Sequence, residues 1–260
     1  KRIDLTSLEA LVRHASLKSI VLELDSVFII IEHEKASGKT TIFTDRFGGL
    51  NFFISSVGHN TYVITSSLRN LYIAKLSRSR IRPDKTAVFE FLWFRRLFGD
   101  KTFISDIKTL GAGAILTFSG GNLISNSCYW TPNYAEPEND TREKLSYSRQ
   151  IEHEILKGVE LATSQPSRHG LFLSGGLDSR ALLGADKQQR YTAVTNTPSQ
   201  NNELLIAREL AGKAGSKHIH IQRPPTYFDD IFSDAMISCN GMTQYYECQF
   251  LGYRKQLASL

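Results

Sequence analysis

LFLSGGLDS, residues 171–179, runs from an apolar stretch through two glycines into a helix expected at residues 179–185. Glycine lets the backbone turn without a Cβ clash, so that its N–H groups can point toward a bound phosphate. The start of the helix adds unpaired N–H groups and about half a positive charge. The stretch therefore predicts an anion site between a strand and a helix.

Each polar side chain of this loop has an expected role. Ser174 and Ser179 can donate hydroxyl hydrogen bonds to phosphate oxygens. Asp178 would repel a phosphate unless a cation lies between them, so we assign it to Mg²⁺. The alternative is an ordinary strand-to-helix turn in which Asp178 or Ser179 caps the helix. The complete string SGGLDS favours a nucleotide, and it is neither a G-x-G-x-x-G fingerprint nor a loop closed by Gly-Lys-Ser or Gly-Lys-Thr.

Strands and helices alternate around this loop. Apolar runs predict strands at residues 170–173, 191–195 and 218–221, with helices at residues 179–185 and 202–214. The alternation predicts a parallel sheet with right-handed crossovers, on which ligands bind beyond the carboxyl ends of the strands. An amphipathic helix precedes the sheet, with apolar side chains at Ile151, Ile155, Leu156, Val159 and Leu161.

The first half has the pattern of an α+β domain. A hairpin is predicted by the runs at 26–32 and 40–44, and strands are also expected at 51–55, 62–66 and 114–118. Gly120-Gly121 predicts a two-residue turn into a strand at 122–125. Pro83 opens an expected helix, whose apolar stripe we expect in the core: Val88, Phe89, Leu92 and Trp93.

TPNYAEPENDT, residues 131–141, has the composition of a linker. It separates an expected domain at residues 1–130 from one at residues 142–260. The chain begins at Lys1 with no signal peptide, so processing, trimming or a fragment of a longer polypeptide all stay open.

Composition excludes several classes of protein. The net charge is +5, but no long Lys/Arg run indicates nucleic-acid binding, and no apolar run approaches the roughly 20 residues that span a bilayer. Three cysteines (Cys128, Cys239 and Cys248) are odd in number and lack zinc-site spacing, so we expect a reducing cytoplasm.

SGGLDS resembles the pyrophosphate loop of the ATP pyrophosphatases, which include asparagine, β-lactam, GMP and NAD synthetases and tRNA-thiolating enzymes. Segments upstream of the loop indicate which of these families the chain resembles most. DRFGGLNFF, residues 45–53, resembles the D-R-x-G-x-x-P-L-Y segment of asparagine synthetases, and weaker matches follow in the family's order at Ser66-Ser67-Leu68, residues 107–113 and Tyr129-Trp130. Downstream, Glu203, Ala207 and Ala211 fit its D-E-x-x-x-A-x-x-x-A helix.

The resemblance to the glutamine-hydrolysing asparagine synthetase family implies both fold and chemistry. It implies an α/β protein, in which the remnant of an Ntn-hydrolase-like glutaminase domain precedes a parallel-sheet ATP-pyrophosphatase domain, truncated here, of the adenine nucleotide alpha hydrolase-like kind. A carboxylate such as aspartate or an analogue would be adenylated by ATP with Mg²⁺, pyrophosphate would leave, and ammonia or an amine would form the amide. The nucleotide residues implied are Leu173, Ser174, Gly175, Gly176, Leu177, Asp178, Ser179 and Thr195, and a homodimer is left open.

The chain also departs from the family. The family's N-terminal cysteine nucleophile and its S-G-x-G-x-D-E segment lie outside these residues, so we expect neither glutaminase nor complete synthetase activity from them. Arg180 replaces a small residue and residues 49–53 lack the family's proline, which indicates a divergent relative, such as those of capsule, β-lactam or lasso-peptide biosynthesis. A degenerate, non-catalytic nucleotide-binding or protein-interaction module is the competing interpretation.

Two lesser sites have ordinary alternatives. His218 and His220 share a strand face and suggest a metal pair, but no third ligand lies nearby in the sequence. Tyr245, Tyr246 and Glu247 lie where synthetase relatives place substrate-binding or general-base residues, although aromatic pairs more often serve packing.

Overall fold

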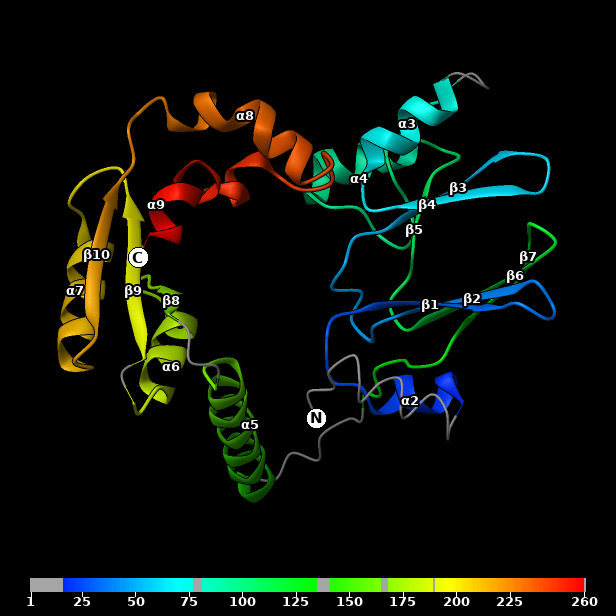
Figure 1. Ribbon diagram of the computed structural model, residues 1–260. Coiled ribbons are helices and arrows are strands. Elements are labelled where there is room, and N and C mark those ends of the chain that lie inside the picture. Colours follow the sequence, from blue (N-terminus) through cyan, green and yellow to red (C-terminus); the bar gives the residue numbers. More distant parts are fainter. Residues whose placement is uncertain (1–15, 77–80, 135–140, 165–167, 189, 260) are drawn as a thin grey trace. The chain divides into compact units, whose positions relative to one another are not determined.

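The computed structural model describes residues 16–76, 81–134, 141–164, 168–188 and 190–259 (Figure 1). These residues form a mixed α/β structure with three sheets. Its contacts divide it into two compact units: the first unit is Lys1–Tyr134 with Met236–Gln244, and the second unit is Ala135–Ala235 with Tyr245–Leu260. Of the expected linker, residues 135–140 lie outside the described residues. None of the described helices is long and apolar enough to cross a membrane.

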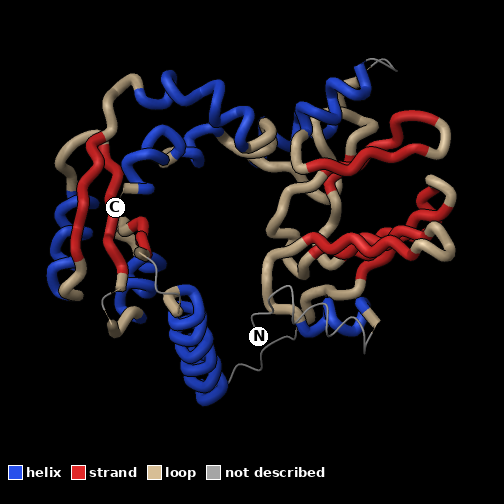
Figure 2. The backbone as a smooth tube through the Cα atoms, viewed as in Figure 1, coloured by secondary structure: helices blue, strands red, loops and turns tan. Residues whose placement is uncertain are grey.

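The first unit is built on two antiparallel sheets (Figure 2). Its sheets have the strand orders β1-β2-β6-β7 and β4-β3-β5. Its strands are β1 (Ile29–Glu34), β2 (Lys39–Thr44), β3 (Phe53–Gly58), β4 (Thr61–Thr65), β5 (Lys108–Thr109), β6 (Ala114–Ser119) and β7 (Asn122–Cys128), and its helices are α2 (Leu17–Glu23), α3 (Leu68–Leu76) and α4 (Lys85–Phe94).

The predicted hairpins are confirmed. β1 pairs with β2 in antiparallel register, with His33 opposite Thr40. Gly120 and Gly121 connect β6 to β7 with φ angles of 56° and 79°, the left-handed backbone that a two-residue hairpin turn requires. A Cβ added to Gly121 would lie 2.0 Å from the carbonyl oxygen of Asn60, so glycine is also needed there for space.

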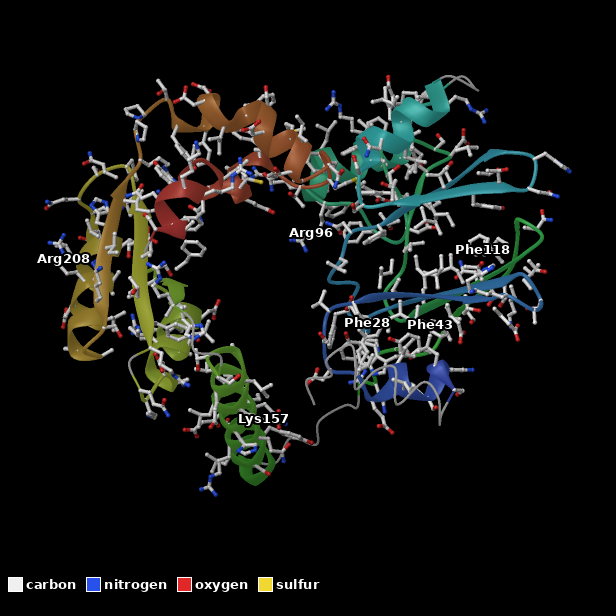
Figure 3. All side chains as sticks on the ribbon, viewed as in Figure 1. Phe28, Phe43, Arg96, Phe118, Lys157 and Arg208 are labelled. Carbon is white, nitrogen blue, oxygen red and sulfur yellow. The ribbon has the colours of Figure 1, made fainter. Side chains whose placement is uncertain are left out.

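Two apolar layers hold the first unit together. Phe43 packs with Ile115 and the buried side of α2, and Phe28 lies against the same cluster (Figure 3). Phe118 belongs to a second cluster that joins β6 to Ile54 and Ile64 of the other sheet. The two sheets therefore share one core, and α2 covers the outer face of the first.

The expected core stripe of α4 is wrong. The helix forms as predicted, because the Asp84 carboxylate accepts a hydrogen bond from the N–H of Ala87 and caps its first turn. It packs through another face, with Ala87 fully buried and Phe91 edge-on to Phe103. The stripe itself is exposed, from 38% to 82% of each side chain: Val88, Phe89, Leu92 and Trp93. Apolar residues run nearly all round this helix, so periodicity alone could not choose its buried face.

The second unit contains a parallel sheet of order β10-β9-β8. This confirms the predicted alternation of strands and helices. Its elements are α5 (Thr141–Ala162), β8 (His169–Phe172), α6 (Leu177–Ala185), β9 (Tyr191–Thr197), α7 (Asn202–Lys213), β10 (Lys217–Gln222), most of α8 (Tyr227–Ser238), the 3₁₀ helices η1 (Tyr245–Cys248) and η2 (Leu251–Tyr253), and α9 (Arg254–Ala258).

Small residues bring α7 close to this sheet. Ala207 and Ala211 are fully buried and pack with Leu171, Leu173 and Ala193 from the two neighbouring strands. The alanine spacing noted in the sequence therefore serves a close contact between helix and sheet.

Candidate functional site

The expected phosphate loop lies between β8 and α6. The N–H of Leu173, the residue after β8, donates to the carbonyl of Val194 at 2.8 Å, so the sheet pairing continues to the edge of the loop. Gly176 is the N-cap of α6 and supplies no side-chain hydrogen bond. The alternative in which Asp178 or Ser179 caps the helix is therefore wrong, and the helix start keeps amide donors without a side-chain cap.

Two hydroxyl groups lie together in the loop. The backbone N–H of Ser174 donates to Ser179 Oγ at 3.1 Å, and the two Oγ atoms are 3.0 Å apart. The N–H of Gly176 donates to Ser174 Oγ at 3.1 Å. The structure thus brings together the two side chains that were expected to bind phosphate oxygens.

The two glycines of the loop differ in how closely they are packed. Neither Gly175 nor Gly176 has a positive φ, so the turn itself does not demand glycine. A Cβ on Gly175 would lie 3.5 Å from the Cα of Glu203 at the start of α7, which is ordinary contact. A Cβ on Gly176 would lie 3.2 Å from Ser174 Oγ and would crowd that hydroxyl. The expected Cβ clash therefore applies to Gly176 and not to Gly175.

Asp178 lies in the first turn of α6 with its side chain exposed, beside the exposed Leu177. Within the described part of the chain, its carboxylate has no hydrogen bond or ion pair. Those same residues contain no group of three or more His, Cys, Asp or Glu side chains able to hold a metal ion. One carboxylate fits Mg²⁺ only where phosphate oxygens and water complete its six ligands, which is the usual arrangement for this ion.

Leu173 and Thr195 lie next to each other, at the ends of neighbouring strands. The buried hydroxyl of Thr195 donates to the carbonyl oxygen of Leu173 at 2.7 Å. This contact links the strand that enters the loop to β9. Both residues were predicted to lie beside the nucleotide.

His218 and His220, suggested as a metal pair, each contact a threonine of β9. His218 Nε2 lies 2.9 Å from Thr195 Oγ1, and His220 Nε2 lies 2.9 Å from Thr197 Oγ1. Each ring therefore uses one nitrogen in a hydrogen bond to β9. Burial, with smaller contributions from the positive charges of Arg208 and His220, lowers the pKa of His218 below its ordinary value. Arg208 is on α7, where Figure 3 labels it.

Sequence reasoning missed a polar group at the carboxyl end of β9. The buried Asn196 accepts a hydrogen bond from Arg223 Nη1 at 3.3 Å, while its Nδ2 has no partner among the described residues. The Arg223 guanidinium also lies over the ring of Phe228, 4.8 Å from its centroid. Asn196 directly follows Thr195, so its place at the strand end was the only signal in the sequence.

Arg180, the residue that departs from the family's small side chain, folds back onto the loop. Its Nη2 donates to the carbonyl of Gly175 at 3.1 Å. Tyr245 instead packs edge-on against Phe228 and Phe232, with centroids 6.0 and 5.3 Å away. The packing interpretation of Tyr245 therefore fits the structure.

The second unit thus combines a three-stranded parallel sheet with a glycine loop at a helix start, an arrangement in which backbone N–H groups can meet an anion. Residues 150–250 match the family model of asparagine synthase. That match contains the whole loop, Thr195 and both histidines, so this part of the chain is similar to asparagine synthase. The match supports, in general terms, a ligase that uses ATP. No curated protein matches the chain.

Proposed function

We propose that the second unit is the nucleotide-binding part of an ATP-dependent amide-forming synthetase of the asparagine synthetase type. The observation that carries this proposal is the cluster of Ser174 and Ser179 hydroxyls at the start of α6, which has no side-chain cap and lies inside the region that matches the family model. Such a cluster offers hydroxyl and amide donors to a pyrophosphate leaving group. It suits a reaction in which ATP loses pyrophosphate.

Each loop residue has a part in this reaction. Ser174, Gly175, Gly176 and Ser179 hold the departing pyrophosphate, and the edge formed by Leu173 and Thr195 lies beside the adenine. Asp178 holds Mg²⁺, which neutralises phosphate charge when it is bound. A substrate carboxylate, of aspartate or an analogue, attacks the α-phosphate, and ammonia or an amine then displaces AMP. The chain's contribution is positioning and charge stabilisation.

We further propose that the first unit derives from an Ntn-hydrolase-like glutaminase domain, joined by the linker at residues 131–141. The segments that carry the upstream resemblance meet in this unit. The N–H of Gly113 donates to the carbonyl of Asp45 at 2.8 Å, and the N–H of Tyr129 donates to the carbonyl of Gly113 at 2.7 Å. Phe47 and Trp130 are in edge-on contact, with centroids 5.1 Å apart. Of the four stretches that resemble the family's segments, three are therefore in contact: residues 45–53, 107–113 and 129–130.

A protein-interaction role is the second candidate, and the exposed face of α4 favours it. Phe89, Leu92 and Trp93 are each more than 70% exposed. A cluster of large exposed apolar side chains commonly marks a surface that binds another protein. This role concerns the first unit and does not require catalysis.

ATP–pyrophosphate exchange tests the proposed reaction. The longest natural form of the polypeptide is incubated with Mg²⁺, labelled pyrophosphate, ATP and aspartate or each of a panel of carboxylates. Carboxylate-dependent label in ATP supports adenylation, and Asp178→Asn should reduce it. Binding of MgATP without exchange favours the non-catalytic candidate, whereas a folded chain without affinity for MgATP contradicts the assignment of the nucleotide site.

A further inference from the structure

Two side-chain relays cross from β10 to the loops at the carboxyl edge of the sheet. We propose that His218 is a positioning residue that orients the phosphate loop through Thr195, and that His220 similarly holds the loop before α7 through Thr197. The functional part of this proposal rests on the proposed nucleotide site. The proposal that His218 orients the loop rests only on the hydrogen bonds described below and does not require nucleotide binding.

The single hydroxyl proton of Thr195 determines which group donates in each hydrogen bond of the first relay. The Thr195 hydroxyl has one proton, which it donates to the carbonyl oxygen of Leu173 at 2.7 Å, since a carbonyl can only accept. The contact of 2.9 Å between His218 Nε2 and Thr195 Oγ1 must therefore be a donation from the ring. His218 carries its proton on Nε2, and the chain of donors runs from β10 through β9 to the end of β8.

The same logic applies two residues further along both strands. Thr197 Oγ1 donates to the carbonyl of Ser199 at 2.9 Å, so His220 Nε2 donates to Thr197 across the contact of 2.9 Å. Ser199 precedes Asn201, the residue whose side chain caps α7. The second relay therefore ends at a different loop and offers a matched control within the same sheet.

The first relay reaches the phosphate loop through one rigid peptide. The Leu173 carbonyl and the Ser174 N–H belong to the same planar peptide group, so fixing one direction fixes the other. That N–H donates to Ser179 Oγ at 3.1 Å, and Ser179 Oγ lies 3.0 Å from Ser174 Oγ. Removing the donor at His218 would free the Thr195 hydroxyl to rotate and would loosen the direction of the Ser174 amide.

Two substitutions separate hydrogen bonding from bulk. His218→Gln places an amide donor near the position of Nε2, whereas His218→Leu fills the space without a donor. A lost hydrogen bond of about 1.4 kcal/mol corresponds to about a tenfold change in affinity. We therefore expect His218→Leu to weaken MgATP binding about tenfold, His218→Gln to stay near the unchanged chain, and His220→Leu to have a smaller effect.

A readout without nucleotide tests the positioning directly. In amide NMR spectra of the full chain, His218→Leu should shift the Ser174 N–H signal, and His220→Leu should leave it in place. Thr195→Val, which removes the hydroxyl, should repeat the effect of His218→Leu, and Thr195→Ser should not. Thermal unfolding shows whether His218→Leu folds. If it does not fold, the comparison of Thr195→Val with Thr195→Ser tests the same relay.

The outcomes distinguish this proposal from the proposed function. An unshifted Ser174 signal in both His218→Leu and Thr195→Val, or an equal shift in His220→Leu, overturns the relay. Unchanged MgATP affinity in a folded His218→Leu chain also overturns its role at the site. If the unchanged chain does not bind MgATP, the proposed function fails, while the NMR comparison still decides whether His218 orients the loop.

Discussion

Ser174 lies in the loop that joins β8 to α6, and Ser179 lies in the first turn of α6, with their Oγ atoms 3.0 Å apart. Because the Gly176 N–H donates to one of these hydroxyls and the Ser174 N–H donates to the other, the loop is held in one shape by its own polar groups. A bound phosphate would meet hydroxyls that are already in place. This preorganisation reduces the ordering cost of binding.

Ser174→Ala is expected to weaken MgATP binding about tenfold, since it removes one phosphate donor and the acceptor of the Gly176 N–H. Titration calorimetry measures the effect. Ser233→Ala, on the exposed side of α8, is the matched control and should leave affinity unchanged. Equal affinity in both variants would show that the Ser174 hydroxyl serves only the turn.

Asp178→Asn should weaken ATP binding in the presence of Mg²⁺ and have little effect in its absence, because the lost charge faces the cation. Stability should hardly change, since the carboxylate is exposed and has no partner in the described residues. Calorimetry with and without Mg²⁺ measures the difference. Glu209→Gln, which removes an exposed carboxylate on α7, is the control. Loss of affinity that does not depend on Mg²⁺ would contradict the metal assignment.

Gly176→Val is expected to abolish ATP binding while the fold survives. The new Cβ would lie 3.2 Å from Ser174 Oγ, so it displaces a phosphate donor rather than a core side chain. Gly184→Ala, on the same helix, meets nothing within 4 Å and should stabilise the chain by about 0.5–1 kcal/mol through helix propensity. Binding assays and urea unfolding of both variants check this. Normal ATP affinity in Gly176→Val would remove the loop from the site.

Stability should fall as the solution becomes more acidic than the ordinary histidine pKa of about 6.5. Burial of His218 lowers its folded-state pKa, and the nearby Arg208 and His220 add to the effect, so the unfolded chain binds the proton more readily. The contribution is fully present above pH ~6.5 and is lost as pH falls through the folded pKa. Urea unfolding at several pH values should show that the free energy of unfolding falls less steeply with decreasing pH in His218→Gln than in the unchanged chain. An identical slope in both proteins would contradict the shift.

The nucleotide loop was predictable because its chemistry is local. Ser174, Ser179 and the helix start are adjacent in sequence, and alternating strands place Leu173 and Thr195 at one sheet edge. The role of the histidines was not predictable, because it depends on which threonine of β9 each ring meets. That pairing follows from strand register, which a pattern of apolar residues does not specify at the level of single atoms.

The buried face of α4 shows a second limit. Ala87 is fully buried while Trp93 is 82% exposed, the reverse of what hydrophobicity suggests. A small side chain permits close packing and a large one does not, so steric fit determines which face of α4 is buried. Likewise Asn196 lies on β9 and Arg223 follows β10, so the two residues meet only after the sheet has formed.

The return of residues 236–244 to the first unit makes neither unit a continuous stretch of polypeptide. Within that return, Asn240 Oδ1 accepts the N–H of Leu68 at 2.9 Å, and Met242 packs on the cluster around Phe53. A backbone cut between Tyr134 and Thr141 would therefore leave contacts within the first unit that join the two pieces without a covalent bond. If the later piece were expressed alone, its residues 236–244 would lack their contacts with the rest of the first unit. The free energy of unfolding of that fragment would therefore underestimate the stability of the intact chain.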